Sequence, residues 1–374
     1  MRNPFTLQLA TNEDFCNRTK EISDLLNYAK NGQNVVLLSP RRMGKSSLTL
    51  RVLKELKQEG YLTVYIDLLP VSSEKEFITK LATNIAKEIG RDVSDKTMRQ
   101  RFEGLFKKLT PVLEIKPDGT SLSIKFDPDA KVNVLLEDLL NGVSIFLKKR
   151  KIKACFVFDE FQEITELPES KNIEGTLRSY IQSEKEISFF FVGSRRRILQ
   201  DMFTNAKRPF YKSAFIYELK RISEEDFVSY IMKKFNESGK ECNKAAASKI
   251  YNIAEGFPYY VQKLSLIAWD ITEKECDIDT VSEAYKILLK DETYGYENIL
   301  SGLTLIQRSV LRAISLEPTS SVFTTEYLKK YSISLGGLQK ALKALLSKDI
   351  VEKDEEGIYK VVDPVFRSWF IETG

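Results

Sequence analysis

The sequence predicts an α/β fold, a parallel sheet with helices on both faces, followed by an all-helical lid and a C-terminal winged helix. Short apolar runs alternate with amphipathic helical patterns over residues 1–217, as is typical of βαβ units. Only helical patterns follow over residues 218–300. Residues 301–374 read as three helices and a two-stranded hairpin, the order of a winged helix-turn-helix. These three segments are the predicted domains.

The first domain, 1–217, opens with regular βα units. A buried strand at Val35–Leu38 precedes a helix with one apolar face, formed by Leu48, Val52, Leu53 and Leu56. Gly60 closes this helix, and further strands and helices are predicted at Leu62–Leu68, Glu74–Gly90, Val132–Leu147, Ala154–Phe158 and Ile187–Val192. Residues 91–129 interrupt the rhythm as an insertion with a β-hairpin, Pro111–Lys116 and Leu122–Phe126, which turns at 117–119.

The second and third domains are assigned from helix signals. A capping box at Ser223–Asp226 opens the lid, whose helices are predicted at Asp226–Phe235, Asn243–Ala254, Tyr259–Glu273 and Thr280–Lys290. The winged helix has predicted helices at Thr304–Ser315, Thr324–Lys330 and Leu335–Ser347 and a hairpin of Ile350–Lys353 and Ile358–Val361.

Composition narrows the classes of protein to consider. The formal charge is +4, from 57 basic and 53 acidic residues, a surplus too small to indicate or exclude a polyanionic partner. The absence of histidine excludes imidazole catalysis and the commonest metal ligand. Four scattered cysteines favour a reducing compartment, and there is neither a secretory signal nor an apolar run long enough to span a membrane. We therefore expect a cytoplasmic protein.

The strand at Val35–Leu38 leads into a phosphate-binding pattern, Ser39-Pro40-Arg41-Arg42-Met43-Gly44-Lys45-Ser46-Ser47. A strand, a tight loop and Gly-Lys-Ser at the start of a helix direct backbone N–H groups at phosphate oxygens. We expect Pro40–Ser47 to bind ATP or ADP, with Lys45 on the β- and γ-phosphates and the Ser46 hydroxyl on Mg²⁺. Ser39 replaces the first glycine of the usual P-loop pattern, which reduces the specificity of the match.

Two acids end the next buried strand, in Phe156-Val157-Phe158-Asp159-Glu160. Two acids after an apolar strand usually begin a solvated helix. Here they follow a phosphate loop, and parallel strands end at the same edge of a sheet. Asp159 is therefore predicted to hold Mg²⁺, and Glu160 to orient and activate the attacking water.

The strand at Ile187–Val192 ends in Gly193-Ser194-Arg195 and would reach the same edge. Ser194 is predicted to sense the γ-phosphate, and Arg195 to stabilise the charge of the transition state. Arg195, Arg196 and Arg197 could equally form a solvated helix start, and the sequence does not distinguish which of them points inward.

Taken together, these motifs resemble the prokaryotic, chiefly archaeal-type, ATPase family of the STAND branch of AAA+ proteins. The resemblance rests on Phe15-Cys16-Asn17-Arg18 with Glu21, the Pro-Arg-Arg-x-Gly-Lys-Ser loop, Phe156–Glu160, Gly193-Ser194 and Gly256-Phe257-Pro258. It implies that Arg18 lies near the adenine and that Pro258, in the lid, contacts bound nucleotide. Lys212 stands where many relatives have an arginine, which argues against an arginine finger acting in trans.

The winged helix has two candidate roles. Helix Leu335–Ser347 would turn Leu338, Ala341, Leu342, Leu345 and Leu346 inward and expose Gln339, Lys340 and Lys343 to a DNA groove. Residues 301–374 carry ten basic and nine acidic residues, however, and the wing is acidic at Glu352, Asp354, Glu355 and Glu356. Duplex binding needs a basic face, which argues against a DNA role. The resemblance to STAND proteins implies instead that this domain packs on the ATPase domain and holds it closed, and we favour that role.

The motifs predict an ATP hydrolase, and the resemblance, together with the lid architecture, implies that it is a slow molecular switch that transmits its nucleotide state through the lid to the winged helix. Expected partners are nucleotide, other copies of the chain in the ATP state and an unidentified protein. Two alternatives remain: a DNA-binding AAA+ ATPase that uses the winged helix on duplex, and a nucleotide-binding interaction module that does not hydrolyse ATP.

Overall fold

The computed structural model describes residues 2–10, 15–90, 104–116, 119–127 and 129–373. They form two compact units. The first consists of Arg18–Ser39 and Lys45–Leu219, and the second of Met1–Asn17, Pro40–Gly44 and Lys220–Gly374. The middle of the phosphate loop, Pro40–Gly44, therefore belongs to the second unit, although the residues on either side belong to the first.

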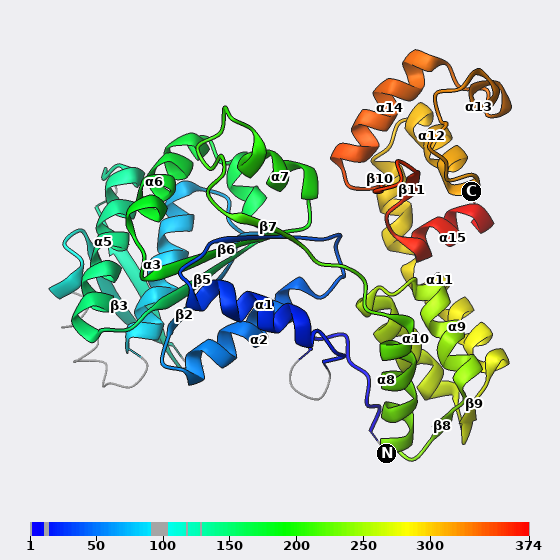
Figure 1. Ribbon diagram of the computed structural model, residues 1–374, viewed down its shortest axis with the longest axis horizontal. Coiled ribbons are helices and arrows are strands. Elements are labelled where there is room, and N and C mark those ends of the chain that lie inside the picture. The colour runs from blue at the N-terminus through cyan, green and yellow to red at the C-terminus, as the bar shows by residue number, and fades with distance from the viewer. Residues whose placement is uncertain (1, 11–14, 91–103, 117–118, 128, 374) are drawn as a thin grey trace. The chain divides into compact units, whose positions relative to one another are not determined.

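A five-stranded sheet forms the centre of the first unit (Figure 1), with the strand order β2-β5-β6-β1-β7. The strands are β1 (Val35–Leu38), β2 (Leu62–Asp67), β5 (Ala154–Asp159), β6 (Ile187–Gly193) and β7 (Phe215–Glu218). All paired neighbours are parallel, with Asp67 opposite Asp159 and Leu38 opposite Gly193. The carboxyl ends of β1, β2, β5 and β6 therefore meet at one edge, as the sequence analysis expects.

Helices cover both faces of this sheet. The helices on one face are α3 (Glu74–Gly90), α5 (Val132–Arg150), α6 (Ser170–Ser183) and α7 (Arg196–Thr204). On the other are α1 (Thr19–Lys30) and α2 (Lys45–Gln58). Side chains of a strand alternate between faces, so Phe156 and Phe158 of β5 pack in the α3–α7 layer while Val157 is buried on the opposite side. The predicted apolar face of α2 is buried throughout.

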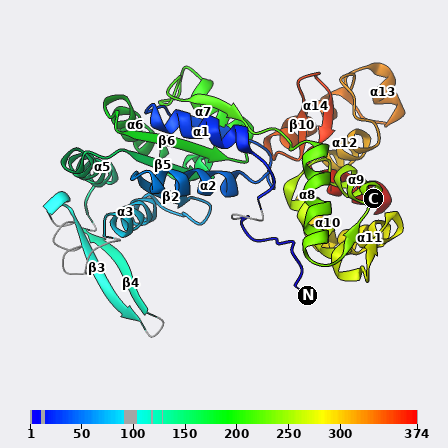
Figure 2. The same cartoon turned by 60° about the horizontal axis from the view of Figure 1, so that its bottom comes forward.

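Other features of the first unit differ in detail from the prediction. The hairpin of the insertion comprises β3 (Leu109–Lys116) and β4 (Gly119–Phe126), which lie beside α3 (Figure 2). The rest of the insertion, at 91–103, and the turn at 117–118 lie outside the described residues. The sequence analysis did not predict the edge strand β7, which is only four residues long and partly exposed at Phe215 and Ile216.

The lid helices of the second unit are α8 (Glu224–Glu237), α9 (Lys244–Ala254), α10 (Pro258–Ile271) and α11 (Ile278–Ser301). Two short parallel strands, β8 (Glu241–Cys242) and β9 (Glu275–Cys276), join this helical domain, an addition that the apolar pattern did not indicate. The N-terminal segment packs on α8, where the ring of Phe5 lies 5.4 Å from that of Phe235.

The winged helix contains α12 (Leu305–Leu316), α13 (Thr325–Lys330), α14 (Leu335–Ser347), the antiparallel pair β10 (Val351–Lys353) and β11 (Tyr359–Val361), and α15 (Pro364–Thr373). The inward residues predicted for α14 are buried, and Gln339, Lys340 and Lys343 are exposed. Only α15 was not predicted. The predicted fold class is confirmed.

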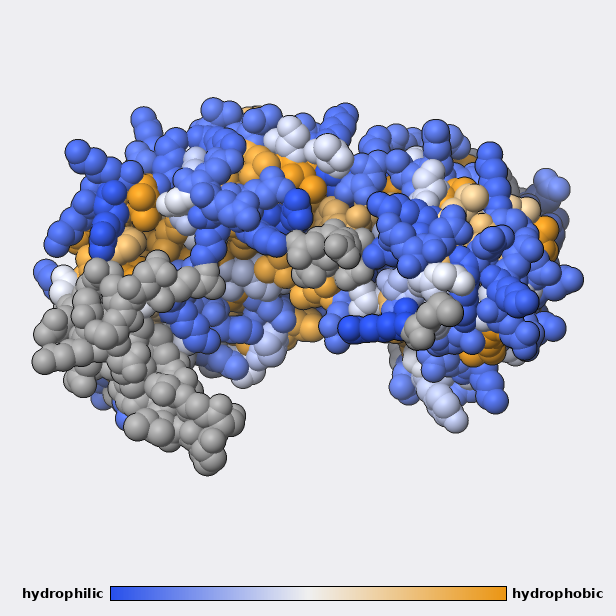
Figure 3. Space-filling model, turned by 90° about the horizontal axis from the view of Figure 1, so that it is seen from below, coloured by the Kyte–Doolittle hydropathy of each residue, from blue (hydrophilic) through white to orange (hydrophobic). Residues whose placement is uncertain are grey.

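Hydrophilic side chains cover most of the face drawn in Figure 3, with apolar residues in smaller areas among them. Within the described ranges, no helix is both long enough and apolar enough to span a lipid bilayer.

Candidate active site

The phosphate loop runs from the buried end of β1 to the first residue of α2. Ser39 has no exposed surface, and two loop residues have left-handed backbone conformations, Arg42 at φ 68° and Gly44 at φ 82°. Glycine adopts this conformation without strain, whereas an arginine does so only when its surroundings hold it there. The loop therefore turns sharply, and α2 begins at Lys45 with its N–H groups facing the loop.

Lys45 is buried, and its Nζ donates to the carbonyl oxygen of Ser39 at 3.0 Å and to Ser39 Oγ at 3.3 Å. The serine in place of the usual glycine is thus accommodated within the turn, and its hydroxyl contacts the predicted phosphate-binding lysine.

Asp159 lies beside Ser46, as the sequence analysis predicts for two groups that share a metal. Both Ser46 Oγ and the Tyr65 hydroxyl donate to Asp159 Oδ2, each at 2.5 Å. Burial raises the pKa of the Asp159 carboxyl, although these two hydrogen bonds act in the opposite direction. Hydroxyl and carboxylate oxygens are the ligands that Mg²⁺ prefers, together with water and phosphate, so Ser46 and Asp159 fit this ion.

Tyr65 is a site residue that the sequence analysis missed. It lies on β2 opposite Val157 of β5, so its hydroxyl reaches the end of that strand. Burial and the charge of Asp159 both raise the pKa of the Tyr65 phenol, which keeps it a hydrogen-bond donor. Tyr65 could be identified in advance only if the order of the strands were known, because β2 and β5 are neighbours in the sheet. A single sequence without repeats does not give that order.

Glu160 and Ser194 are brought together, as expected for residues that end neighbouring strands. Glu160 Oε2 accepts hydrogen bonds from Ser194 Oγ at 2.9 Å and from Ser194 N at 3.2 Å. Gln162 Nε2, which the sequence analysis did not identify, donates to the same oxygen at 2.5 Å. Gln162 has no exposed surface, and Glu160, the residue after β5, has a left-handed φ of 52°.

Arg195 has a different neighbourhood from its predicted one. Its Nη1 lies 3.3 Å from Glu166 Oε1, and its Nε lies 3.7 Å from Glu163 Oε1. Both carboxylates belong to the short helix η2 (Phe161–Glu166). The structure thus shows Arg195 paired with these two carboxylates.

The remaining predicted residues lie in two places. Arg18, which precedes α1, is buried with a left-handed φ of 81°, and it forms an ion pair with Glu21 at 2.7 Å. Pro258 is the first residue of α10, and its Cγ lies 4.0 Å from the position that a Cβ on Gly44 would occupy. The lid proline therefore contacts the phosphate loop. Within that loop Met43 and Ser47 are buried, and Arg41 is exposed.

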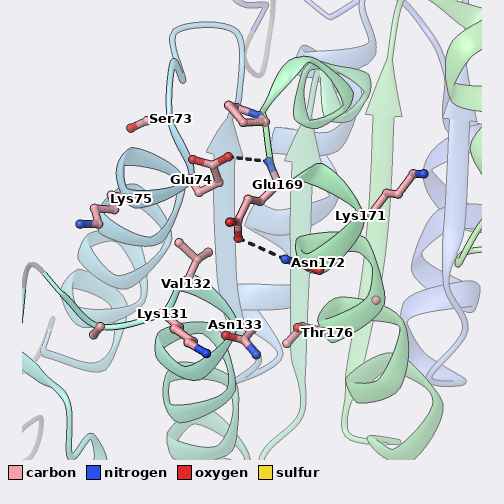
Figure 4. A pocket seen from close by; sticks show the side chains of 13 residues that line it. Ser73, Glu74, Lys75, Lys131, Val132, Asn133, Glu169, Lys171, Asn172 and Thr176 are labelled. Atoms are coloured by element: carbon pink, nitrogen blue, oxygen red, sulfur yellow. Dashed lines mark hydrogen bonds between the residues drawn. The ribbon is translucent and has the colours of Figure 1, made fainter.

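A separate cavity of about 850 Å³ lies in the first unit at the starts of α3, α5 and α6 (Figure 4). Its lining mixes charges, with Lys75, Lys131 and Lys171 beside Glu74 and Glu169. Glu169 N donates to Glu74 Oε1 at 2.8 Å, and Asn172 Nδ2 donates to Glu169 Oε2 at 3.1 Å. None of the predicted site residues lines this cavity, so it is distinct from the phosphate loop.

Comparisons with known proteins agree with this fold. No match was found among curated protein sequences. A Walker-type ATPase of Pyrococcus abyssi, PABY2304, is 19% identical with a TM-score of 0.70, over 98% of this chain and 99% of that one. The Aeropyrum pernix ORC2 protein, solved in ADPNP–ADP complexes, is 14% identical with a TM-score of 0.61, over 99% of this chain and 96% of that one. At these identities the similarity establishes the fold.

The family comparison is more specific. Residues 294–372 match the model of a probable winged helix domain. Residues 15–264, more than half of the chain, match the model of an ATPase domain that occurs predominantly in Archaea. The phosphate loop, Asp159, Glu160 and Ser194 all fall within that match, and the chain belongs to this family of archaeal-type P-loop ATPases.

Proposed function

We propose that the chain is an ATP-hydrolysing molecular switch that couples its nucleotide state to the lid and the winged helix. The observation that carries this proposal is the arrangement of two carboxylates at the carboxyl edge of the sheet. Asp159 is hydrogen-bonded to Ser46 of the phosphate loop, and its neighbour Glu160 is held by Ser194 and Gln162. In this proposal Asp159 would hold the metal, and Glu160 would orient the attacking water.

Binding depends on the phosphate loop. N–H groups at the start of α2 and the Lys45 ammonium would contact the β- and γ-phosphates, in place of the contact between Lys45 and Ser39. Ser46 and Asp159 would hold Mg²⁺, whose charge, when bound, offsets that of the phosphates. Proximity of Pro258 to Gly44 supports a lid contact with the same nucleotide.

Hydrolysis depends on Glu160. Glu160 Oε2 accepts hydrogen bonds from Ser194 and Gln162, and Oε1 would accept a proton from an attacking water. Ser194 holds the carboxylate and adjoins the position expected for the γ-phosphate. Arg195 would have to leave Glu163 and Glu166 to reach the transferred charge. That requirement is one reason to expect slow turnover.

The switch itself is proposed from the lid and winged helix that follow the ATPase domain. An ADP-bound resting state, cytoplasmic localisation, self-association with ATP bound and an unidentified protein partner complete the proposal. The predicted domain limits, 1–217, 218–300 and 301–374, are retained as part of it.

The test is phosphate release from Mg-ATP over a range of protein concentrations, for the wild type and for Glu160→Gln and Lys45→Ala. We expect slow release in the wild type and none in either variant, with ATP still bound by Glu160→Gln. Glu59→Gln, which removes a surface carboxylate paired with Lys30, is the matched control and should behave as the wild type.

A rate per subunit that rises with concentration would support self-association. ATP binding without phosphate release in the wild type would contradict the enzyme proposal and support the non-hydrolysing module. A second candidate, duplex DNA binding, has one supporting observation, namely the exposure of Gln339, Lys340 and Lys343 on α14.

A further inference from the structure

Arg42, in the middle of the phosphate loop, is bound to the lid and to the winged helix. Its Nη2 lies 3.3 Å from Glu292 Oε2 on α11, and its Nη1 lies 3.4 Å from Asp363 Oδ2, immediately before α15. The guanidinium carbon also lies 4.4 Å from the ring centre of Tyr259 and 5.1 Å from that of Tyr260. All these residues belong to the second compact unit.

The partners of Arg42 are themselves fixed. Tyr260 has no exposed surface, and its hydroxyl is hydrogen-bonded to Arg42, to Asp363 and to the hydroxyl of Tyr296. Glu292 is buried and accepts hydrogen bonds from Lys263 Nζ at 2.6 Å and from the Tyr259 hydroxyl at 3.1 Å. Because the groups that contact Arg42 are already ordered, these contacts cost little further conformational entropy.

The two carboxylate oxygens of Asp363 have different hydrogen-bond partners. Oδ1 accepts hydrogen bonds from the N–H groups of Val365 at 3.0 Å and Phe366 at 2.9 Å, which caps α15. Oδ2 faces Arg42 and Tyr260. The charge that holds Arg42 therefore comes from the residue that fixes the start of the last helix of the winged helix.

The backbone of Arg42 is held as well as its side chain. Its carbonyl oxygen accepts a hydrogen bond from the N–H of Tyr259 at 3.4 Å, and its φ of 68° is unfavourable for an arginine unless other contacts stabilise it. Lys45 follows three residues later. A loop this short cannot change its conformation at Arg42 without displacing the amides and the lysine that bind phosphate.

We propose that Arg42 is a positioning residue that ties the phosphate loop to Asp363 of the winged helix, so that release of bound nucleotide depends on this tether. The inference rests on the proposed nucleotide site and specifies how that site is regulated. When the tether holds, the loop keeps its shape and nucleotide leaves slowly. When the winged helix withdraws Asp363, the loop relaxes and nucleotide leaves faster.

The first test is the rate at which fluorescently labelled ADP leaves the protein after dilution into unlabelled ADP. Asp363→Asn keeps an oxygen for the α15 cap but loses the charge, and Arg42→Gln removes the other partner. Both should release ADP faster by about fivefold, since partly exposed ion pairs contribute up to about 1 kcal/mol. The double variant should release it no faster than either single variant.

Arg367→Gln is the matched control. Arg367 also lies on α15 and joins the winged helix to the lid through an ion pair of 2.7 Å with Glu255, but the described contacts of this pair do not include the phosphate loop. We expect less than a twofold change. Equal acceleration by Arg367→Gln and Asp363→Asn would overturn the proposal, because general docking of the winged helix would then explain both. Slower release from Asp363→Asn would also overturn it, since Asp363 would then compete with the phosphates for Arg42.

Hydrogen exchange in the absence of nucleotide provides a second readout. Amides at 41–47 should exchange faster in Asp363→Asn than in the wild type and Arg367→Gln. Because this measurement needs no ligand, it separates two failures. A wild type that does not bind ADP contradicts the proposed function, whereas unchanged exchange in Asp363→Asn contradicts the tether. Unchanged far-UV circular dichroism in each variant confirms that the fold is intact.

Discussion

At the scale of single residues, Asp159 shows how a buried carboxylate lowers stability. It is 4% exposed, and burial raises its pKa, while Ser46 and Tyr65 stabilise the charged form in part. A carboxyl whose pKa is higher in the folded state binds its proton more tightly there than in the unfolded chain. The free energy of unfolding therefore falls as pH rises from the ordinary aspartate value through the folded value, and stays lower above it.

Asp159→Asn should consequently be more stable than the wild type at neutral pH without nucleotide, and it should lose Mg²⁺-dependent hydrolysis. We expect a rise in melting temperature of about 2 °C at pH 7, which disappears at a pH below the ordinary aspartate pKa. Differential scanning calorimetry at the two pH values measures this. A variant less stable than the wild type at pH 7 would show that the hydrogen bonds to Asp159 outweigh its desolvation.

Gly193 is a second position where a single added atom, a Cβ, would disturb the proposed site. A Cβ there would lie 2.1 Å from Gln162 Oε1 and 2.9 Å from Leu199 Cδ2. In Gly193→Ala, Gln162 must move and can no longer hold Glu160 in place. We expect ATP binding to change by less than about twofold and hydrolysis to fall by about tenfold or more.

Single-turnover phosphate release with a parallel binding titration separates the two effects of Gly193→Ala. Gly175→Ala in α6 is the control, since a Cβ there would meet no other group within 4 Å. Equal loss of binding and hydrolysis in Gly193→Ala would indicate general disruption of the sheet edge instead.

At the scale of elements, an ion pair between a buried carboxylate and a partly exposed arginine joins α6 to the segment between α7 and β7. Glu174 has no exposed surface, and Arg208 Nη2 lies 2.9 Å from its Oε1. Burial raises the pKa of Glu174, and the charge of Arg208 opposes that rise. Removing one partner of such a pair lowers the free energy of unfolding more than replacing the buried charged group with a neutral one.

Arg208→Met should therefore lower the free energy of unfolding by about 3 kcal/mol, because it leaves an uncompensated buried carboxylate. Glu174→Gln should cost about 1 kcal/mol or less, since a neutral amide has the same shape. Urea denaturation followed by circular dichroism measures both. If the two variants lose equal stability, the carboxylate must be compensated by some group other than Arg208.

At the scale of the whole molecule, the winged helix raises the question of whether the protein binds duplex DNA. The exposed side chains of α14 include Lys340 and Lys343, but Lys360 of the wing is neutralised by Glu352 at 3.7 Å and Asp354 at 3.0 Å. We expect a fluorescent duplex to bind with a dissociation constant weaker than about 10 µM at about 0.15 M salt. Fluorescence anisotropy tests this, and Glu355→Lys with Glu356→Lys should tighten binding. Sub-micromolar, salt-dependent binding by the wild type would favour the DNA-binding alternative.

Much of the fold and of the site is predictable from local sequence. The runs at Val35–Leu38 and Ala154–Phe158 identify buried strands because fully buried parallel strands are continuously apolar. The residues that follow such strands must reach one edge of the sheet, which is why Lys45, Asp159 and Ser194 could be named in advance. The edge strand β7 could not, because its side chains are mostly exposed and it lacks the pattern of a buried strand. The two-residue strands β8 and β9 are too short for a hydrophobic period.

The sequence by itself determined the buried strands, many of the helices and the groups that follow the strands, since these are encoded in adjacent residues. Only the tertiary structure decided which groups meet. It brings Tyr65 to Asp159 and Asp363 to Arg42, the last pair being 321 residues apart in the chain. Such contacts depend on strand order and domain packing, and these arise from the balance of many distant contacts that no local pattern records.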